Sequence, residues 1–244
     1  MHAPRTRPRL KLESSFTLSR TKLSKSRGSV AGTFITFEGI DGSGKSTQLR
    51  LVSNFLKGLG CEVLLTREPG GTTIGLRLRA ALLDAQEEVD PLTELLVFAA
   101  DRAQHVRRVL RPALETGRVV ISDRYADATV AYQGAGRGFE PDLVAEIVRL
   151  ATEGLVPDLT LLFDVPVAES TSRTTRRSNV RNKLDRLDIE HRDFHERVRD
   201  AYLRIAAADP QRVKVIDSSG AVEATQERVR SILVPFLRER GHIR

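Results

Sequence analysis

The chain has 244 residues, 40% of them hydrophobic and 29% charged, and carries a formal net charge of +7 at pH 7. A chain of this length and composition can bury one sizeable core. No apolar run approaches the roughly 20 residues needed to span a bilayer, so we expect no membrane partner. The single cysteine, Cys61, excludes an intramolecular disulfide and favours a reducing compartment, so we predict a cytoplasmic location.

The positive charge is concentrated at the N-terminus. Residues 1–32 contain eight Lys or Arg and one acidic residue, which accounts for the whole net charge and leaves residues 33–244 neutral. A neutral body argues against a broad polyanion-binding surface, so we expect no nucleic-acid partner. We interpret residues 1–32 as a disordered basic extension, with a transit peptide or an early start codon as alternatives, and residues 33–244 as one domain.

The first predicted strand, residues 33–37, leads into a glycine-rich loop with the P-loop pattern G-x-x-x-x-G-K-S, and a helical pattern follows over residues 46–59. In such a loop backbone amides approach phosphate oxygens, Lys45 reaches the β- and γ-phosphates, and the Ser46 hydroxyl binds Mg²⁺. The alternative is a glycine turn with a solvated lysine. The predicted ATP-binding residues of the loop are Gly39, Ile40, Asp41, Gly42, Ser43, Gly44, Lys45, Ser46 and Thr47.

Four further strands and several helices follow in alternation. The expected strands are residues 63–66, 119–122, 159–163 and 213–216, and the expected helices are residues 74–83, 92–116, 127–133, 141–152 and a last one to about 240. This alternation predicts an α/β, three-layer P-loop NTPase fold with a five-stranded parallel sheet flanked by helices. Ligands of such sheets gather at the carboxyl ends of the strands. The polar residues expected there are Glu38, Arg67, Glu68, Asp123, Arg124, Asp164 and Asp217.

A basic, polar segment occupies residues 171–188, between the last two predicted strands. A solvated helix face is the ordinary interpretation of such a charge run. Its place between two strands of a P-loop sheet favours instead a lid, which closes over ATP and brings cationic groups to the transferred phosphoryl.

Four motifs together resemble the thymidylate kinases of the bacterial type, which are P-loop nucleoside monophosphate kinases. They are FEGIDGSGKST at residues 37–47, TREPGGT at 66–72, FAADR at 98–102 and DRYADATVAYQG at 123–134, and the resemblance covers nearly all of residues 33–240. It implies ATP-dependent phosphorylation of thymidine monophosphate (dTMP) to the diphosphate, with Mg²⁺ as cofactor and a homodimer as the assembly. The apolar positions of residues 92–110 or 127–150 suit a dimer interface, but equally a core.

The resemblance also implies roles for individual residues. Asp123 is expected to bind Mg²⁺, with a helix N-cap as the alternative. Arg124, and secondarily Arg67, are expected on the acceptor phosphate. The predicted base-binding residues are Phe98, Arg102, Thr129 and Gln133, although a helical Phe is more often core. Tyr132 and Tyr125 are expected beside the sugar, and Asp41 is expected to accept the 3′-hydroxyl.

One position departs from part of the family. Some members carry an arginine directly after the P-loop aspartate, where this chain has Gly42. Members without that arginine supply the cation from the lid, so Arg181 is the predicted catalytic lid residue, with Arg177 and Arg186 as further ATP-binding candidates. The isomer of the Glu68–Pro69 bond stays open.

The sequence supports other functions less well than thymidylate kinase activity. Residues 182–185 fit N-K-x-D and residues 217–220 fit D-x-x-G, as in a GTPase, but their order is reversed and residues 174–181 are polar. A kinase acting on another nucleoside monophosphate or on a nucleoside keeps the same fold. A nucleic-acid-binding role would rest on residues 1–32 alone.

Overall fold

The computed structural model describes residues 31–85, 87–181 and 190–244, and these are built around a parallel β-sheet. The five strands follow the order β2-β3-β1-β4-β5. Their bounds are β1 Thr33–Glu38, β2 Val63–Arg67, β3 Val119–Asp123, β4 Leu159–Asp164 and β5 Val213–Asp217. Each strand contains a predicted one and extends one residue further, so the predicted fold is confirmed.

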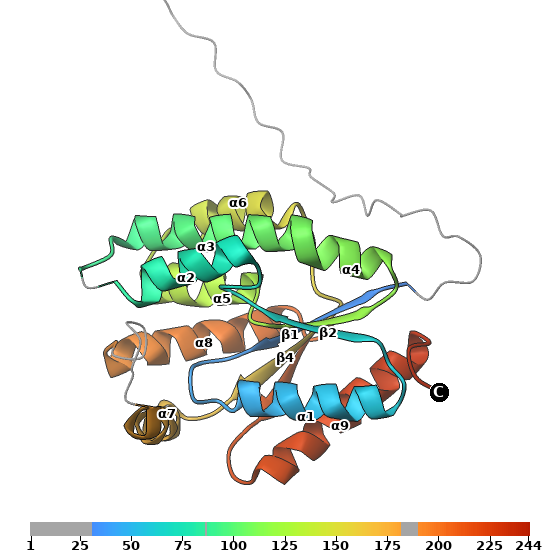
Figure 1. The fold of residues 1–244 in the computed structure, drawn as a ribbon. Coiled ribbons are helices and arrows are strands. Elements are labelled where there is room, and N and C mark those ends of the chain that lie inside the picture. Colours follow the sequence, from blue (N-terminus) through green and yellow to red (C-terminus); the bar gives the residue numbers. More distant parts are fainter. Residues whose placement is uncertain (1–30, 86, 182–189) are drawn as a thin grey trace, which may run out of the picture.

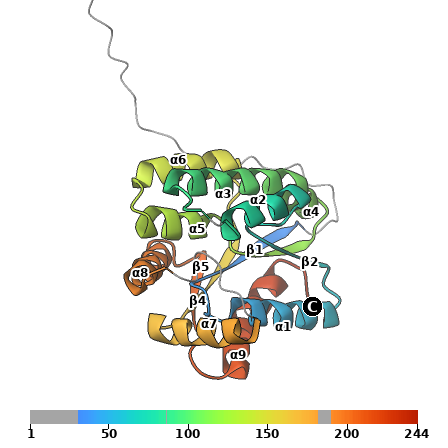
Figure 2. The same ribbon diagram turned by 60° about the vertical axis from the view of Figure 1, so that its left-hand side comes forward.

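Helices cover both faces of the sheet (Figure 1). Beneath it lie α1 (Lys45–Gly58), α7 (Val167–Arg181) and α9 (Val222–Glu239), and Figure 2 shows the same grouping after rotation. The other face carries α2 Thr73–Leu83, α3 Pro91–His105, η1 Val106–Leu110, α4 Arg111–Glu115, α5 Ala126–Thr129, η2 Val130–Gly136, α6 Pro141–Thr152 and α8 Arg192–Ala208. In the described part of the chain, no helix is both long enough and apolar enough to cross a lipid bilayer.

The central strands are buried because helices cover both of their sides. All six residues of β1 are buried, and side chains that alternate along the strand enter different cores. Ile35 and Phe37 pack in the core that contains Leu233 of α9. Phe34 packs in the opposite core with Tyr125. This double cover explains why the strands read as nearly continuous β-branched and aromatic runs in the sequence.

Local signals set the helix starts. Thr72 caps α2, because its Oγ1 accepts a hydrogen bond from the Gly75 amide at 2.9 Å.

The predicted helix at residues 92–116 corresponds to α3, η1 and α4 together. The five residues of η1, in its middle, are π-helical.

Helix α8 was not predicted. Its buried residues Phe194, Val198, Ala201 and Tyr202 follow helical spacing, which is the signal that could have identified it. Seven charged residues between Arg192 and Arg204 obscure that pattern. Helix α7 begins at Val167, before the basic segment of residues 171–188, and includes the first part of that segment, while residues 182–188 lie outside the described residues.

Candidate functional site

The polar residues at the carboxyl ends of the strands lie along one edge of the sheet. Strand register aligns Phe37 with Asp123, and Arg67 with the same Asp123, so the ends of β1, β2 and β3 are level. The P loop leaves β1 at this edge, and the Asp123–Arg124 pair leaves β3 beside it. This register is why residues about 80 positions apart in the sequence form one site.

The P loop has the backbone geometry that its glycines permit. Gly39 has a φ of 133°, and a Cβ on it would lie 2.4 Å from the Phe163 carbonyl oxygen, so both conformation and space require glycine. Gly42 has a φ of 77°, and a Cβ there would lie 2.5 Å from the Ser170 carbonyl oxygen of α7. The arginine that some family members carry at this position would therefore meet α7 here.

Lys45 lies in the hollow of this loop. Its Nζ donates to the carbonyl oxygens of Gly39 and Ile40 at 2.7 and 2.9 Å. Burial and the nearby charge of Arg124 lower the pKa of Lys45 to about 8, against the attraction of Asp41. A desolvated cation at a helix N-terminus favours an anionic ligand.

The P loop forms one wall of a cleft of about 390 Å³. Arg173 of α7 lies on the same cleft and donates to the Ser218 carbonyl oxygen at 3.1 Å. The other lining residues beyond the loop are Gln48, Arg124, Ser218, Gly220, Val222 and Thr225. Those that follow β5 were not predicted, although the glycine-containing turn at residues 217–220 was a signal for a loop at this edge.

Asp123 and Ser46 face each other across the strand edge. Ser46 Oγ donates to Asp123 Oδ2 at 3.4 Å. Asp123 Oδ1 is buried, has no hydrogen-bond partner among the described residues and lies 3.9 Å from the Arg124 guanidinium. The carboxylate caps no helix, because α5 begins after Tyr125 without a side-chain cap. One hydroxyl and one carboxylate with an unoccupied oxygen suit Mg²⁺, which takes few protein ligands and keeps water and phosphate oxygens. Within the described residues, no group of three or more His, Cys, Asp or Glu could hold a metal.

Asp41 links Arg124 to Tyr132. Arg124 Nη2 donates to Asp41 Oδ1 at 2.6 Å, and the Tyr132 hydroxyl donates to Oδ2 at 3.1 Å. Burial opposes the ionised form of Asp41, but the charges of Arg124 and Lys45 hold the pKa of this carboxyl well below its usual range. The site therefore contains a firmly ionised carboxylate between two cations.

A second pocket opens on the other side of Asp41, and the four predicted base-binding residues lie together on its wall (Phe98, Arg102, Thr129 and Gln133). Arg102 is 3% exposed and donates to Glu68 Oε2, Thr129 Oγ1 and the Tyr125 carbonyl oxygen at 2.8, 2.7 and 2.8 Å. Phe98 belongs to none of the buried core clusters found in the described residues. The four predicted base-binding residues thus line one cavity.

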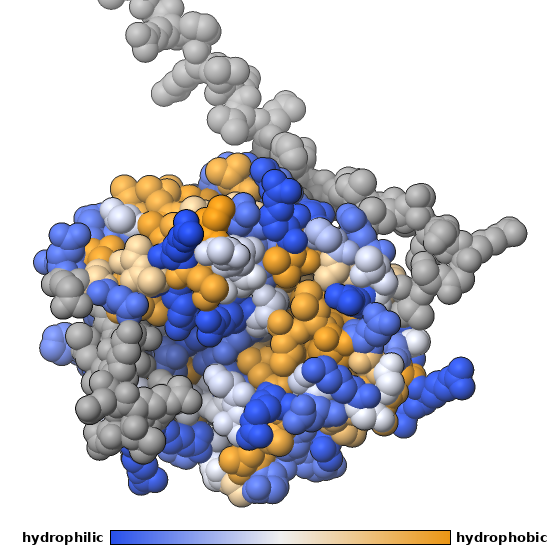
Figure 3. Space-filling model, viewed as in Figure 1, coloured by the Kyte–Doolittle hydropathy of each residue, from blue (hydrophilic) through white to orange (hydrophobic). Residues whose placement is uncertain are grey.

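The two clefts meet at shared residues. Among the residues described, Asp41 and Arg124 line both the pocket at Phe98 and the cleft of the P loop. Figure 3 shows hydrophilic side chains in the hollow between the upper helices and α1. Arg67 is exposed and lines a groove next to Ser46 and Asp123 rather than the pocket at Phe98.

The predicted position of Tyr125 is wrong. It was expected beside Tyr132 at the sugar, but it is fully buried and packs edge-on against Phe34, with ring centroids 4.9 Å apart. Its hydroxyl donates to the Leu155 carbonyl oxygen at 3.2 Å. The backbone turns at Arg124, whose φ is 69°, and this turn directs the next side chain into the core.

A buried polar network behind the pocket was also missed. Glu68 bridges Arg102 and His105, with 2.8 Å from its Oε1 to His105 Nδ1, and His105 Nε2 lies 2.6 Å from Thr66 Oγ1. Asp101 Oδ1 accepts from the Gly70 amide at 3.1 Å. The Glu68–Pro69 bond is cis. Only the positions of Glu68 at a strand end and of His105 at i+3 from Arg102 indicated such a network.

The predicted lid arginines stay predictions. The backbone of Arg181 ends α7, but the side chains of Arg177 and Arg181 and the whole of Arg186 lie outside the described residues.

Comparisons with known proteins agree on one family. The thymidylate kinase family model matches residues 37–229. The thymidylate kinase of Pelobacter propionicus is 47% identical over 201 residues, which are 81% of this chain and 92% of the relative; that of Leifsonia xyli is 49% identical over 82% of this chain and 93% of its own. The crystal structure of thymidylate kinase from Ehrlichia chaffeensis superposes with a TM-score of 0.67 at 35% identity, covering 84% of this chain and 99% of that one.

Proposed function

The chain belongs to the thymidylate kinase family, and on that basis we propose how it catalyses the ATP-dependent phosphorylation of dTMP to the diphosphate. The observation that carries the proposal is the pair of clefts joined at Asp41 and Arg124. Two nucleotides bound in these clefts would meet with their phosphates at the junction. Phosphoryl transfer needs this end-to-end arrangement of donor and acceptor.

The donor side is the P loop. We propose that ATP phosphates bind the amides of residues 39–47 and that Lys45 exchanges its carbonyl partners for phosphate oxygens. Asp123 and Ser46 would hold Mg²⁺, and Asp123 Oδ1, which has no hydrogen-bond partner among the described residues, supports this assignment. The ion, when bound, neutralises charge on the phosphates.

The acceptor side is the pocket at Phe98. We place the thymine ring against Phe98, with Arg102, Thr129 and Gln133 at its polar edge and Tyr132 near the sugar. Asp41 would accept the 3′-hydroxyl, while Arg124, with Arg67 further out, would bind the 5′-phosphate through planar guanidinium contacts. The acceptor is already an ionised phosphate, so no general base is needed, and the chain contributes positioning and charge neutralisation.

The lid would complete the charge balance. Gly42 packs directly against α7, which supports the proposal that the missing P-loop cation comes from that helix and the segment after it. We propose Arg181 as the catalytic arginine and Arg177 and Arg186 as ATP ligands. Arg181→Ala should lower kcat far more than it raises the KM for dTMP, and equal effects on both would argue against this role.

We further propose a homodimer formed through α3 and α6. Leu92 and Leu96 of α3 and Leu143 and Leu150 of α6 are between 43 and 72% exposed, and hydrophobic residues gather over these helices in Figure 3. Exposed apolar side chains gathered on one face favour association. We place the enzyme in the cytoplasm, with residues 33–244 as its catalytic domain and residues 1–32 as an extension without a nucleic-acid partner.

An acceptor panel tests the function. Purified protein with ATP and Mg²⁺ is assayed against dTMP, deoxyuridylate, uridylate and thymidine, with Lys45→Ala as the inactive control. We expect the highest kcat/KM for dTMP, and deletion of residues 1–32 should leave it unchanged. Activity on thymidine but not on dTMP would overturn the assignment of the acceptor.

A further inference from the structure

Arg124 has a backbone conformation that arginine rarely adopts. Its φ of 69° lies in the left-handed region, which costs about 1 to 2 kcal/mol for a residue with a Cβ. Such a conformation persists only when the surroundings enforce it. Because the direction of the guanidinium depends on this backbone, whatever holds the turn also aims Arg124.

Three hydrogen bonds hold the turn. The Arg124 amide donates to the Phe37 carbonyl oxygen at 3.0 Å, and the Ser122 hydroxyl donates to the Arg124 carbonyl oxygen at 2.8 Å. The amide of the next residue, Tyr125, donates to Glu38 Oε1 at 2.7 Å. Two of these partners belong to the end of β1, the strand that leads into the P loop.

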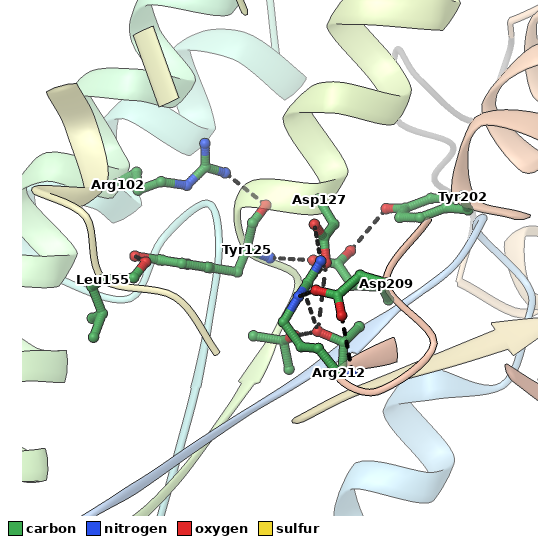
Figure 4. Close-up of polar contacts among 10 residues, drawn as sticks. Arg102, Tyr125, Asp127, Leu155, Tyr202, Asp209 and Arg212 are labelled. Atoms are coloured by element: carbon green, nitrogen blue, oxygen red, sulfur yellow. Dashed lines mark hydrogen bonds and ion pairs between the residues drawn. The ribbon is translucent and has the colours of Figure 1, made fainter. Parts of the chain in front are cut away.

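Glu38 is fully buried, and both of its carboxylate oxygens are used. Oε1 accepts from the Tyr125 amide, and Oε2 accepts from the Tyr202 hydroxyl of α8 at 2.8 Å. Figure 4 shows Tyr125 and Tyr202 on opposite sides of Asp127. Glu38 lines neither the pocket at Phe98 nor the P-loop cleft, so it has no access to either nucleotide.

A buried carboxyl group costs the fold stability, and the hydrogen bonds of Glu38 explain why one is present here. Burial, followed by the charge of Asp127, raises the pKa of Glu38 to about 8. An apolar side chain would pack without this penalty but would leave the Tyr125 amide unsatisfied. The Tyr125 carbonyl is itself bonded to Arg102 of the other pocket wall. The turn is therefore held between Glu38 and the predicted base-binding arginine.

We propose that Glu38 is a positioning residue for phosphoryl transfer: through the Tyr125 amide it keeps the Arg124 backbone left-handed and directs the guanidinium to the junction of the two clefts. This inference rests on the proposed role of Arg124 at the acceptor phosphate. It predicts that changes at Glu38 affect the acceptor nucleotide and spare ATP.

Three variants separate hydrogen bonding from charge. Glu38→Gln keeps both contacts, because its oxygen accepts from Tyr125 and its amide donates to Tyr202. Glu38→Ala removes both. Tyr202→Phe is the matched control, since it removes one partner of Glu38 but leaves the bond to Tyr125.

The readouts are KM for dTMP, KM for ATP and kcat, with circular dichroism as a check on folding. We expect Glu38→Ala to lower kcat/KM for dTMP by about tenfold or more while KM for ATP changes less than about twofold. Glu38→Gln and Tyr202→Phe should stay within about threefold of the parent on both nucleotides. Equal losses on dTMP and ATP in Glu38→Ala, or a loss in Glu38→Gln as large as in Glu38→Ala, would overturn the proposal.

A double-mutant cycle with Arg124→Ala distinguishes this inference from the function beneath it. If Arg124→Ala leaves dTMP kinetics unchanged, the proposed role of Arg124 fails. If Arg124→Ala is impaired and Glu38→Ala adds its full effect on top, only the positioning role fails, because a residue that acts through Arg124 has nothing left to position. Should Glu38→Ala not fold, Ser122→Ala tests the same turn from its other side, and an unchanged KM for dTMP in that variant would refute the inference.

Discussion

Replacing Arg102 by methionine tests how the pocket at Phe98 is built. Arg102 is 3% exposed, and its guanidinium donates to Glu68, Thr129 and the Tyr125 carbonyl at 2.7 to 2.8 Å. Methionine fills most of the aliphatic volume but removes the cation, which leaves the buried Glu68 carboxylate with His105 as its remaining side-chain partner among the described residues. Removing one member of a buried ion pair typically lowers the free energy of unfolding by about 3 to 5 kcal/mol.

The measurement is urea denaturation near neutral pH without added nucleotide, followed by circular dichroism. Arg107→Met is the matched control: Arg107 is paired with Glu153 at 2.7 Å, but its side chain is 66% exposed, so the loss should be about 0 to 1 kcal/mol. The m-value should be unchanged in both variants if unfolding remains two-state. A loss for Arg102→Met no larger than that of Arg107→Met would show that the pair does not hold the pocket together.

Three further predictions concern the turn after β3, the buried carboxyl and a helix cap. Arg124→Lys should lower kcat/KM for dTMP by at least about tenfold, because an ammonium cannot form the planar two-point contact with phosphate; unchanged kinetics would exclude that contact. Folding raises the pKa of Glu38 from 4.5 to about 8, so between these pH values the folded state holds a proton that the unfolded state has lost. The free energy of unfolding should therefore fall as pH rises from about 4.5 to about 8. Glu38→Gln should flatten that slope, and parallel pH profiles of the two proteins would contradict this. Thr72→Ala should destabilise the protein by about 1 kcal/mol in the same urea assay, because the Gly75 amide loses its cap, and no change would show that water replaces it.

The sheet could be predicted because its signals are local. A parallel strand covered on both faces must be apolar on both sides, so runs such as residues 33–37 and 119–122 stand out from the helical periods between them. The P loop adds glycines whose spacing follows from phosphate geometry. The edge of the sheet that carries Asp123 then follows from topology alone.

Features that depend on contacts between distant segments could not be predicted. The direction of Tyr125 depends on the left-handed backbone at Arg124, which the sequence around it does not signal. Glu38 acquires its role from an amide 87 positions away and a tyrosine hydroxyl 164 positions away. Helix α8 was missed because charged residues surround its apolar stripe, and that same helix supplies Tyr202.

The contact between Arg124 and Asp41 bears on how the proposed acceptor site would select its ligand. Arg124 Nη2 lies 2.6 Å from Asp41 Oδ1, so an acceptor phosphate that takes this arginine must compete with a carboxylate. Replacing the Arg124–Asp41 ion pair by an Arg124–phosphate pair contributes less binding free energy than forming a new pair from two solvated ions, because the guanidinium already has an anionic partner. In the proposed complex, Asp41, once released, would accept a hydrogen bond from the sugar 3′-hydroxyl, a group that inorganic phosphate lacks. The nucleotide would therefore satisfy both members of the pair in that complex, whereas inorganic phosphate would leave the half-buried Asp41 carboxylate without a replacement for Arg124. The ion pair that either ligand must first break would thus favour the nucleotide.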